Sequence, residues 1–124
     1  MGFLIVFIGG GLGAALRHGV NLMVARLLGT AFPYGTFFIN IAGSLTMGLI
    51  AGYFAMRGHL SQRWLLFLTT GILGGFTTFS AFSLDAVLLY ERGQTFAAAI
   101  YVVGSVVLAI AALVAGLAVV RALA

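Results

Sequence analysis

The chain has 124 residues, of which 63% are hydrophobic and only 6% are charged, and it contains no cysteine. Soluble domains carry about 25% charged residues, so this composition excludes an ordinary soluble protein and indicates one that lies in a membrane. The net charge of +4 comes from arginines scattered along the chain, which excludes the basic patch of a nucleic-acid-binding protein.

Four apolar segments are each long enough to form a transmembrane helix, which needs about 20 residues. They cover approximately residues 3–24, 34–56, 64–90 and 95–120. The connections between them are short, hold most of the charged residues and leave no room for a soluble domain. The sequence therefore predicts an all-α integral membrane protein, with residues 1–124 as a single multi-pass membrane domain.

The first segment contains Arg17, which has no acidic residue near it in the sequence. An arginine inside a membrane is costly, and two interpretations are open. The side chain can extend to the interface from the end of a short span. Alternatively, it faces an aqueous vestibule, where its positive potential would attract anions.

The second segment carries Thr36, Asn40 and Ser44 at intervals of four residues, which places them on one stripe of a helix. Serine and threonine hydroxyls are often satisfied by carbonyls of their own helix. The amide of Asn40 needs more partners, because it has two donor hydrogens and an acceptor oxygen. We therefore interpret Asn40 as part of an ion pathway or of a helix interface.

The third segment contains the stretch GGFTTFSAFS at residues 74–83. Glycines followed by two threonines make a poor helix, so a local break is predicted, and broken backbone can bind a cation through its carbonyls. Beyond the break, Phe79 and Phe82 would share one helix face, with Ser80 on the next. Aromatic rings have a positive edge, which can help to hold a small anion.

The fourth segment carries two polar residues, Tyr101 and Ser105, which are again four residues apart.

The only acidic residues of the chain are Asp85 and Glu91, near the end of the third segment. Proton-driven carriers normally need a carboxylate well inside a span, so such a carrier is disfavoured.

Glycine pairs with three residues between them recur in the first three segments, at Gly9/Gly13, Gly48/Gly52 and Gly71/Gly75. This spacing lets helix backbones approach closely.

The charges on the two sides of the membrane are nearly balanced. One side carries Arg57, Arg63 and Arg121, and the other carries Arg26 and Arg92. Either the N-terminus lies inside, or the chain inserts both ways and pairs antiparallel with its own copy.

Three stretches carry a resemblance to a known family: GGLGAALR at 10–17, PYGTFFINIAGS at 33–44 and TGILGGFTTFSAFSLD at 70–85. Over its whole length the chain resembles the small bacterial fluoride channels, the Fluc or CrcB family. Two departures stand out. Ala81 replaces a threonine of the typical motif, and the polar positions on the fourth helix end at Ser105, before Ala109 and Leu113.

The resemblance implies an antiparallel, dual-topology homodimer of four-helix subunits, with a broken third helix and two fluoride pores at the subunit interface. It implies a central structural sodium ion, not transported, held by the backbone carbonyls of Gly74 and Thr77. The implied ion pathway consists of Asn40, Phe79, Phe82, Ser80, Thr36, Tyr101, Ser105 and Arg17.

The function implied is passive, selective export of cytoplasmic fluoride across the bacterial inner membrane, which would give fluoride resistance. The expected partners are fluoride, membrane lipid and a second copy of the chain, without nucleic acid. Two alternatives are a small multidrug exporter, which should carry a glutamate in its first span, and a structural subunit of a membrane complex. An enzyme is not expected, since no cluster of metal-ligating side chains is present in the sequence.

Overall fold

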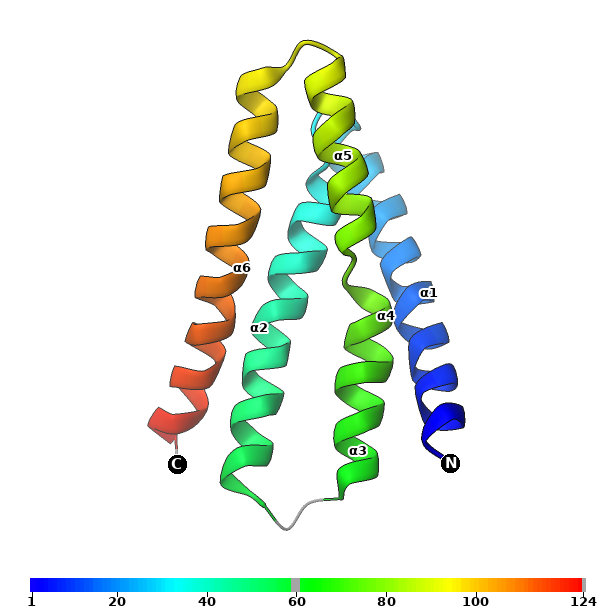
Figure 1. Cartoon of the computed structure of the whole chain (residues 1–124), viewed down its shortest axis with the longest axis vertical. Coiled ribbons are helices and arrows are strands. Elements are labelled where there is room, and N and C mark those ends of the chain that lie inside the picture. Colours follow the sequence, from blue (N-terminus) through cyan, green and yellow to red (C-terminus); the bar gives the residue numbers. More distant parts are fainter. Residues whose placement is uncertain (59–60, 124) are drawn as a thin grey trace.

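The computed structural model describes residues 1–58 and 61–123, and the regular structure in these residues is helical throughout. Four helical spans are long and apolar enough to cross a membrane: α1 (Gly2–Leu28), α2 (Tyr34–Met56), a third span over Gln62–Glu91, and α6 (Thr95–Leu123). The start of α1 and the end of α6 lie at the same end of the bundle (Figure 1). The predicted all-α membrane class is confirmed.

Two helices continue past the apolar segments that were expected to span the membrane. α1 runs to Leu28 with Arg26 in its last turn, and it ends where Gly29 adopts a positive φ of 77°. α6 runs to Leu123 with Arg121 in its last turn. Hydropathy identifies only the apolar part of a helix that lies in the hydrocarbon core. The hydrogen-bonded backbone of the helix continues into the membrane–water interface. Basic residues in a last turn also interact favourably with the helix dipole.

The third span is built from four pieces: α3 (Gln62–Leu66), the π-helical segment η1 (Phe67–Leu73), α4 (Gly74–Phe76) and α5 (Phe79–Glu91). The predicted break lies between α4 and α5. The π-helix was not predicted from the sequence. Such segments are rare and often mark functional regions, and this one directly precedes the glycine pair at the break.

The break lets the third span change its packing partner halfway along its length. Before the break, η1 and α4 pack against α1, whereas α5 packs against α6. The other extensive contact joins α2 to α6, so the bundle consists of two helix pairs connected by the third span (Figure 1). A small aromatic cluster around Phe82 and Tyr101, together with Leu89 and Ala98, forms the core between α5 and α6.

Glycines make both helix pairs close enough for backbones to touch. A Cβ atom on Gly9 of α1 would lie 2.9 Å from the Cα of Gly71, and one on Gly48 of α2 would overlap the carbonyl oxygen of Leu113 in α6. A Cβ on Gly116 of α6 would lie 2.6 Å from the carbonyl oxygen of Leu45. The small residues therefore act as the packing surfaces that their spacing predicts.

We expect the replacement Gly48→Ala to destabilise the subunit, because the added methyl group collides with the backbone of α6. Overpacking of this kind costs about 1–3 kcal/mol. The midpoint of thermal unfolding in detergent should fall clearly below that of the wild type. Gly19→Ala is the matched control, since its Cβ would meet nothing within 4 Å. Equal midpoints for the two variants would show that the α2–α6 seam is not tightly packed.

Candidate functional site

The third span is interrupted between α4 and α5 by two residues with extended backbone. Thr77 has φ −81° and ψ 159°, and Thr78 has φ −153° and ψ 121°. Thr78 is also the N-cap of α5, because its hydroxyl accepts a hydrogen bond of 3.1 Å from the N–H of Ala81. A threonine suits this position, since it tolerates extended backbone and its oxygen satisfies one of the free N–H groups of the helix.

Asn40 on α2 binds the break through both functions of its side-chain amide. Its Nδ2 donates to the carbonyl of Thr78 at 3.0 Å, and its Oδ1 accepts from the N–H of Thr78 at 2.9 Å. The amide thus replaces the peptide groups that a continuous helix would provide. Because an unsatisfied backbone group costs several kcal/mol in a membrane, this side chain makes the extended segment tolerable there.

These bonds divert the two N–H groups that would otherwise close the helix across the break. In a continuous α-helix the N–H of Thr78 would donate to the carbonyl of Gly74, and that of Ala81 to the carbonyl of Thr77. Instead, the first donates to Asn40 and the second to the Thr78 hydroxyl. The carbonyl oxygens of Gly74 and Thr77 are released from these helical donors, and Gly74 is exposed on the surface of the subunit.

A cavity of about 300 Å³ lies against the break and is lined by residues of α2, α5 and α6. Its polar lining consists of Asn40, Ser44, Thr77, Thr78 and Ser105. Ser105 is only 5% exposed, and its Oγ has no hydrogen-bond partner within residues 1–58 and 61–123. Leaving a buried hydroxyl unpaired costs about 1–3 kcal/mol, so this group is a donor available to a polar occupant of the cavity.

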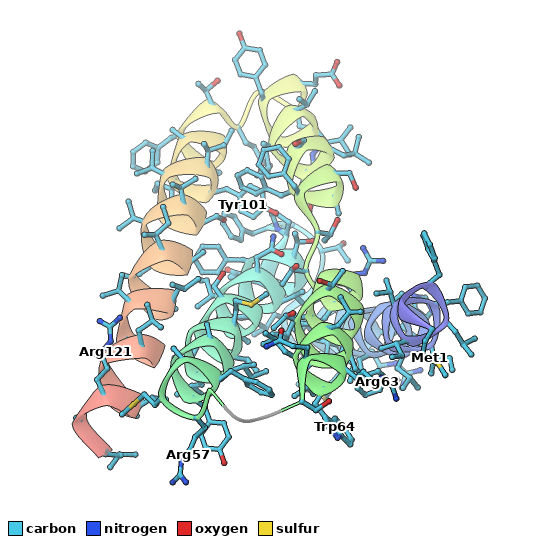
Figure 2. All side chains as sticks on the ribbon, turned by 60° about the horizontal axis from the view of Figure 1, so that its bottom comes forward. Met1, Arg57, Arg63, Trp64, Tyr101 and Arg121 are labelled. Atoms are coloured by element: carbon cyan, nitrogen blue, oxygen red, sulfur yellow. The ribbon has the colours of Figure 1, made fainter. Side chains whose placement is uncertain are left out.

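The aromatic side of the cavity is formed by Phe79 and Phe82. Their ring centroids are 5.6 Å apart, with the planes tilted by 46°. Phe82 is buried and packs on Tyr101 at 5.1 Å, whereas Phe79 is 77% exposed within one subunit. One ring is therefore fixed by the core, and the other lies at the open face of the subunit. Figure 2 shows Tyr101 projecting inward from α6 toward this region.

Tyr101, which packs on Phe82 of the first cavity, also contacts a residue that lines a second cavity of about 630 Å³. Its hydroxyl donates to Oδ2 of Asp85 at 3.1 Å. Asp85 and Thr36 both line the second cavity, which lies beside the α1–α2 connection and also includes Arg92. Tyr101 therefore contacts one wall residue of each cavity, Phe82 of the first and Asp85 of the second, and both cavities have polar groups in their walls.

The residues predicted for the ion pathway do not all come together in one place. Asn40, Phe79, Phe82 and Ser105 line the first cavity, whereas Thr36 lines the second. Ser80 is exposed, with its Oγ 3.4 Å from that of Thr78.

Arg17 is half-buried and is absent from the lining residues of both cavities. It lies one turn beyond Gly13 on α1, and Gly13 packs against the start of the break at Phe76. The structure therefore places Arg17 on the α1 side of the third span, and both interpretations of its role stay predictions.

Two residues of the site were not singled out in the sequence. In the sequence, Thr78 contributes to the predicted break only as one of two threonines. Its position three residues before Ala81, at the start of a predicted helix, is nevertheless typical of an N-cap. Gly43 lines the first cavity opposite Thr77, and its role depends on a contact across the bundle that sequence spacing does not reveal.

Comparison with known proteins gives a consistent result over the whole chain. Residues 4–117 match the family model described as CrcB-like protein, Camphor Resistance (CrcB). The chain is 68% identical to a protein of Rhodopseudomonas palustris strain BisB5 named fluoride-specific ion channel FluC, over 99% of both chains. It is 64% identical to the protein of Nitrobacter hamburgensis named fluoride-specific ion channel FluC 2, over 98% of both chains. It is 67% identical to the protein of Methylobacterium nodulans named fluoride-specific ion channel FluC, over 95% of this chain and 94% of the relative.

We expect Asn40→Ala to destabilise the protein, because the N–H and C=O of Thr78 both lose their partner. Each buried group left unsatisfied costs about 1–3 kcal/mol. The midpoint of thermal unfolding in detergent should fall accordingly. Thr46→Val on the same helix is the control, since the Thr46 hydroxyl bonds only to its own helix at Ala42. An Asn40→Ala midpoint no lower than that of the control would mean that the amide does not support the break.

Proposed function

The chain belongs to the CrcB family, and from this membership we propose that it is a fluoride-selective channel in the bacterial inner membrane. Its function would be passive export of fluoride and hence fluoride resistance. The observation that carries the proposal is the buried hydroxyl of Ser105, which has no partner in the part of the chain that the structure describes and faces the same cavity as Asn40 and two phenylalanine rings.

The cavity offers donors suited to a small anion. The Nδ2 of Asn40 has two hydrogens, and only one is needed for the bond to the Thr78 carbonyl. The hydroxyl of Ser105 supplies a second donor, and the positive ring edges of Phe79 and Phe82 supply weaker ones. Few donors in a confined space favour an ion that fits them closely, which is one source of channel selectivity.

No proton-coupling group is required for this transport. Hydrogen fluoride enters cells as a neutral acid, dissociates at cytoplasmic pH and leaves the anion trapped inside. A channel lets the membrane potential drive the anion outward, with about 2.3 kcal/mol per charge for each 100 mV. Asp85, the acid closest to the pathway, already accepts a hydrogen bond from Tyr101.

The proposed assembly is an antiparallel homodimer with two pores. Within one subunit Phe79 is 77% exposed and Gly74 also lies at the surface, so both are open to a second copy. Arg57, Arg63 and Arg121 lie at the end of the bundle that holds Met1 (Figure 2), and the opposite end also carries arginines. Such a weak charge bias is compatible with insertion in both directions.

The released carbonyls of Gly74 and Thr77 fit the sodium ion that the resemblance implies. Sodium is a hard cation and takes oxygen ligands, and these two oxygens have lost their helical donors. One subunit supplies two such oxygens, and a second copy would double that number. Bound there, the ion would supply positive charge that holds the two breaks together, while fluoride passes elsewhere.

We expect purified protein in liposomes to release fluoride rapidly when a potassium ionophore sets the potential, as read with a fluoride electrode. Chloride-loaded vesicles and protein-free vesicles should show no comparable release. A folded protein that releases no fluoride, or that releases chloride equally fast, would overturn the proposal. The result would then favour an exporter or a structural subunit.

We expect Phe82→Ile to reduce fluoride release by about tenfold or more, because the aliphatic side chain has no positive edge to offer the ion. Phe96→Ile on α6 is the matched control, since Phe96 is 79% exposed and remote from the cavity lining. Size-exclusion chromatography should give the same assembly for both variants. Normal fluoride flux through Phe82→Ile would rule out a contribution of this ring edge.

A further inference from the structure

We propose that Gly43 of α2 is a positioning residue for the break in the third span, a role that rests on the proposed channel function. The absence of a side chain at Gly43 creates the space in which the γ-methyl group of Thr77 lies. A Cβ atom at Gly43 would overlap that methyl group and would also lie 3.5 Å from the ring of Phe76. Gly43 itself is buried.

This contact differs from those of Gly48 and Gly116, the glycines at the α2–α6 contact whose Cβ would overlap backbone. A Cβ on Gly48 or Gly116 would meet the backbone of a neighbouring helix, so these residues serve helix approach. A Cβ on Gly43 would instead meet a side chain of the extended segment. Gly43 lies one turn beyond Asn40, on the face of α2 that binds Thr78. The two residues together form one docking face for the break.

Thr77 can turn its side chain aside for a larger residue at Gly43 only by losing a hydrogen bond. Its hydroxyl donates to the carbonyl of Leu73 at 3.0 Å, and its backbone N–H donates to the same carbonyl at 2.9 Å. The next residue, Thr78, is held by the amide of Asn40. A methyl group added at Gly43 must therefore shift the extended segment or α2, or break the bond of the Thr77 hydroxyl to Leu73.

Such a shift would reach the groups on which conduction depends. The Thr77 carbonyl is one of the two released at the break, and Phe79 follows two residues later. Both Gly43 and Thr77 line the cavity that holds Asn40 and Ser105. The size of residue 43 would therefore control the geometry of the pathway without residue 43 offering any group to the ion.

A size exchange between the two positions tests this role. Gly43→Ala should lower fluoride release per folded protein by about tenfold or more, as expected for overpacking. Thr77→Ser keeps the hydroxyl bound to Leu73 and removes only the γ-methyl group. The double variant Gly43→Ala/Thr77→Ser should therefore release fluoride several-fold faster than Gly43→Ala, because the new methyl takes the vacated space. Gly11→Ala, whose Cβ meets nothing within 4 Å, is the matched control and should behave as wild type.

Each outcome of this experiment either supports or refutes the positioning role of Gly43. Wild-type flux through Gly43→Ala, or a double variant no faster than that single variant, would overturn the positioning role. If Gly43→Ala fails to assemble, recovery of assembly and flux in the double variant supports the role, and its continued failure refutes it.

The thermal midpoints of the same four variants separate this inference from the proposed function. Restoration of the midpoint in the double variant tests the Gly43–Thr77 contact even in a protein that does not conduct. Absence of fluoride flux in the wild type would refute the channel function alone.

Discussion

The need to satisfy backbone hydrogen bonds away from water governs the centre of this molecule. A membrane helix can be interrupted only where other groups take over the N–H and C=O groups that the interruption exposes. At the break two side chains do so: the amide of Asn40 binds the N–H and C=O of Thr78, and the hydroxyl of Thr78 accepts from the N–H of Ala81. Each of these bonds is local or crosses a single helix contact, so the break is held by groups of its own chain.

The same bonds explain how a structural feature becomes a functional one. By taking the N–H of Thr78, Asn40 removes the helical donor of the Gly74 carbonyl, and the cap on α5 does the same for Thr77. The break also redirects α5 from α1 toward α6, which brings Phe82 onto Tyr101. In the proposed channel, one interruption of one helix would thus supply both oxygens for a cation and ring edges for an anion.

The sequence predicted much of this arrangement and missed particular parts of it for physical reasons. Span number and helix class follow from hydropathy, and the break follows from glycines and hydroxyls placed where a helix needs neither. Asn40 was recognised because an amide inside a membrane needs partners, but its partner lies 38 residues away and only folding identifies it. The π-helix of η1 and the role of Gly43 depend on how facing helices meet, which residue spacing along one helix does not encode.

The cavity is open on the side of Phe79, and in the proposed dimer this bears on how selectivity would arise. Fluoride is small and strongly hydrated, so its water must be replaced by several close donors. One subunit offers a spare hydrogen of Asn40, the hydroxyl of Ser105 and two ring edges, while Ala109 and Leu113 continue the cavity with apolar walls. Because Phe79 is exposed, the second copy of the proposed dimer would supply the remaining enclosure. In the proposed dimer, exclusion of water and selection of the ion would therefore be achieved by the same assembly step that brings the two breaks together.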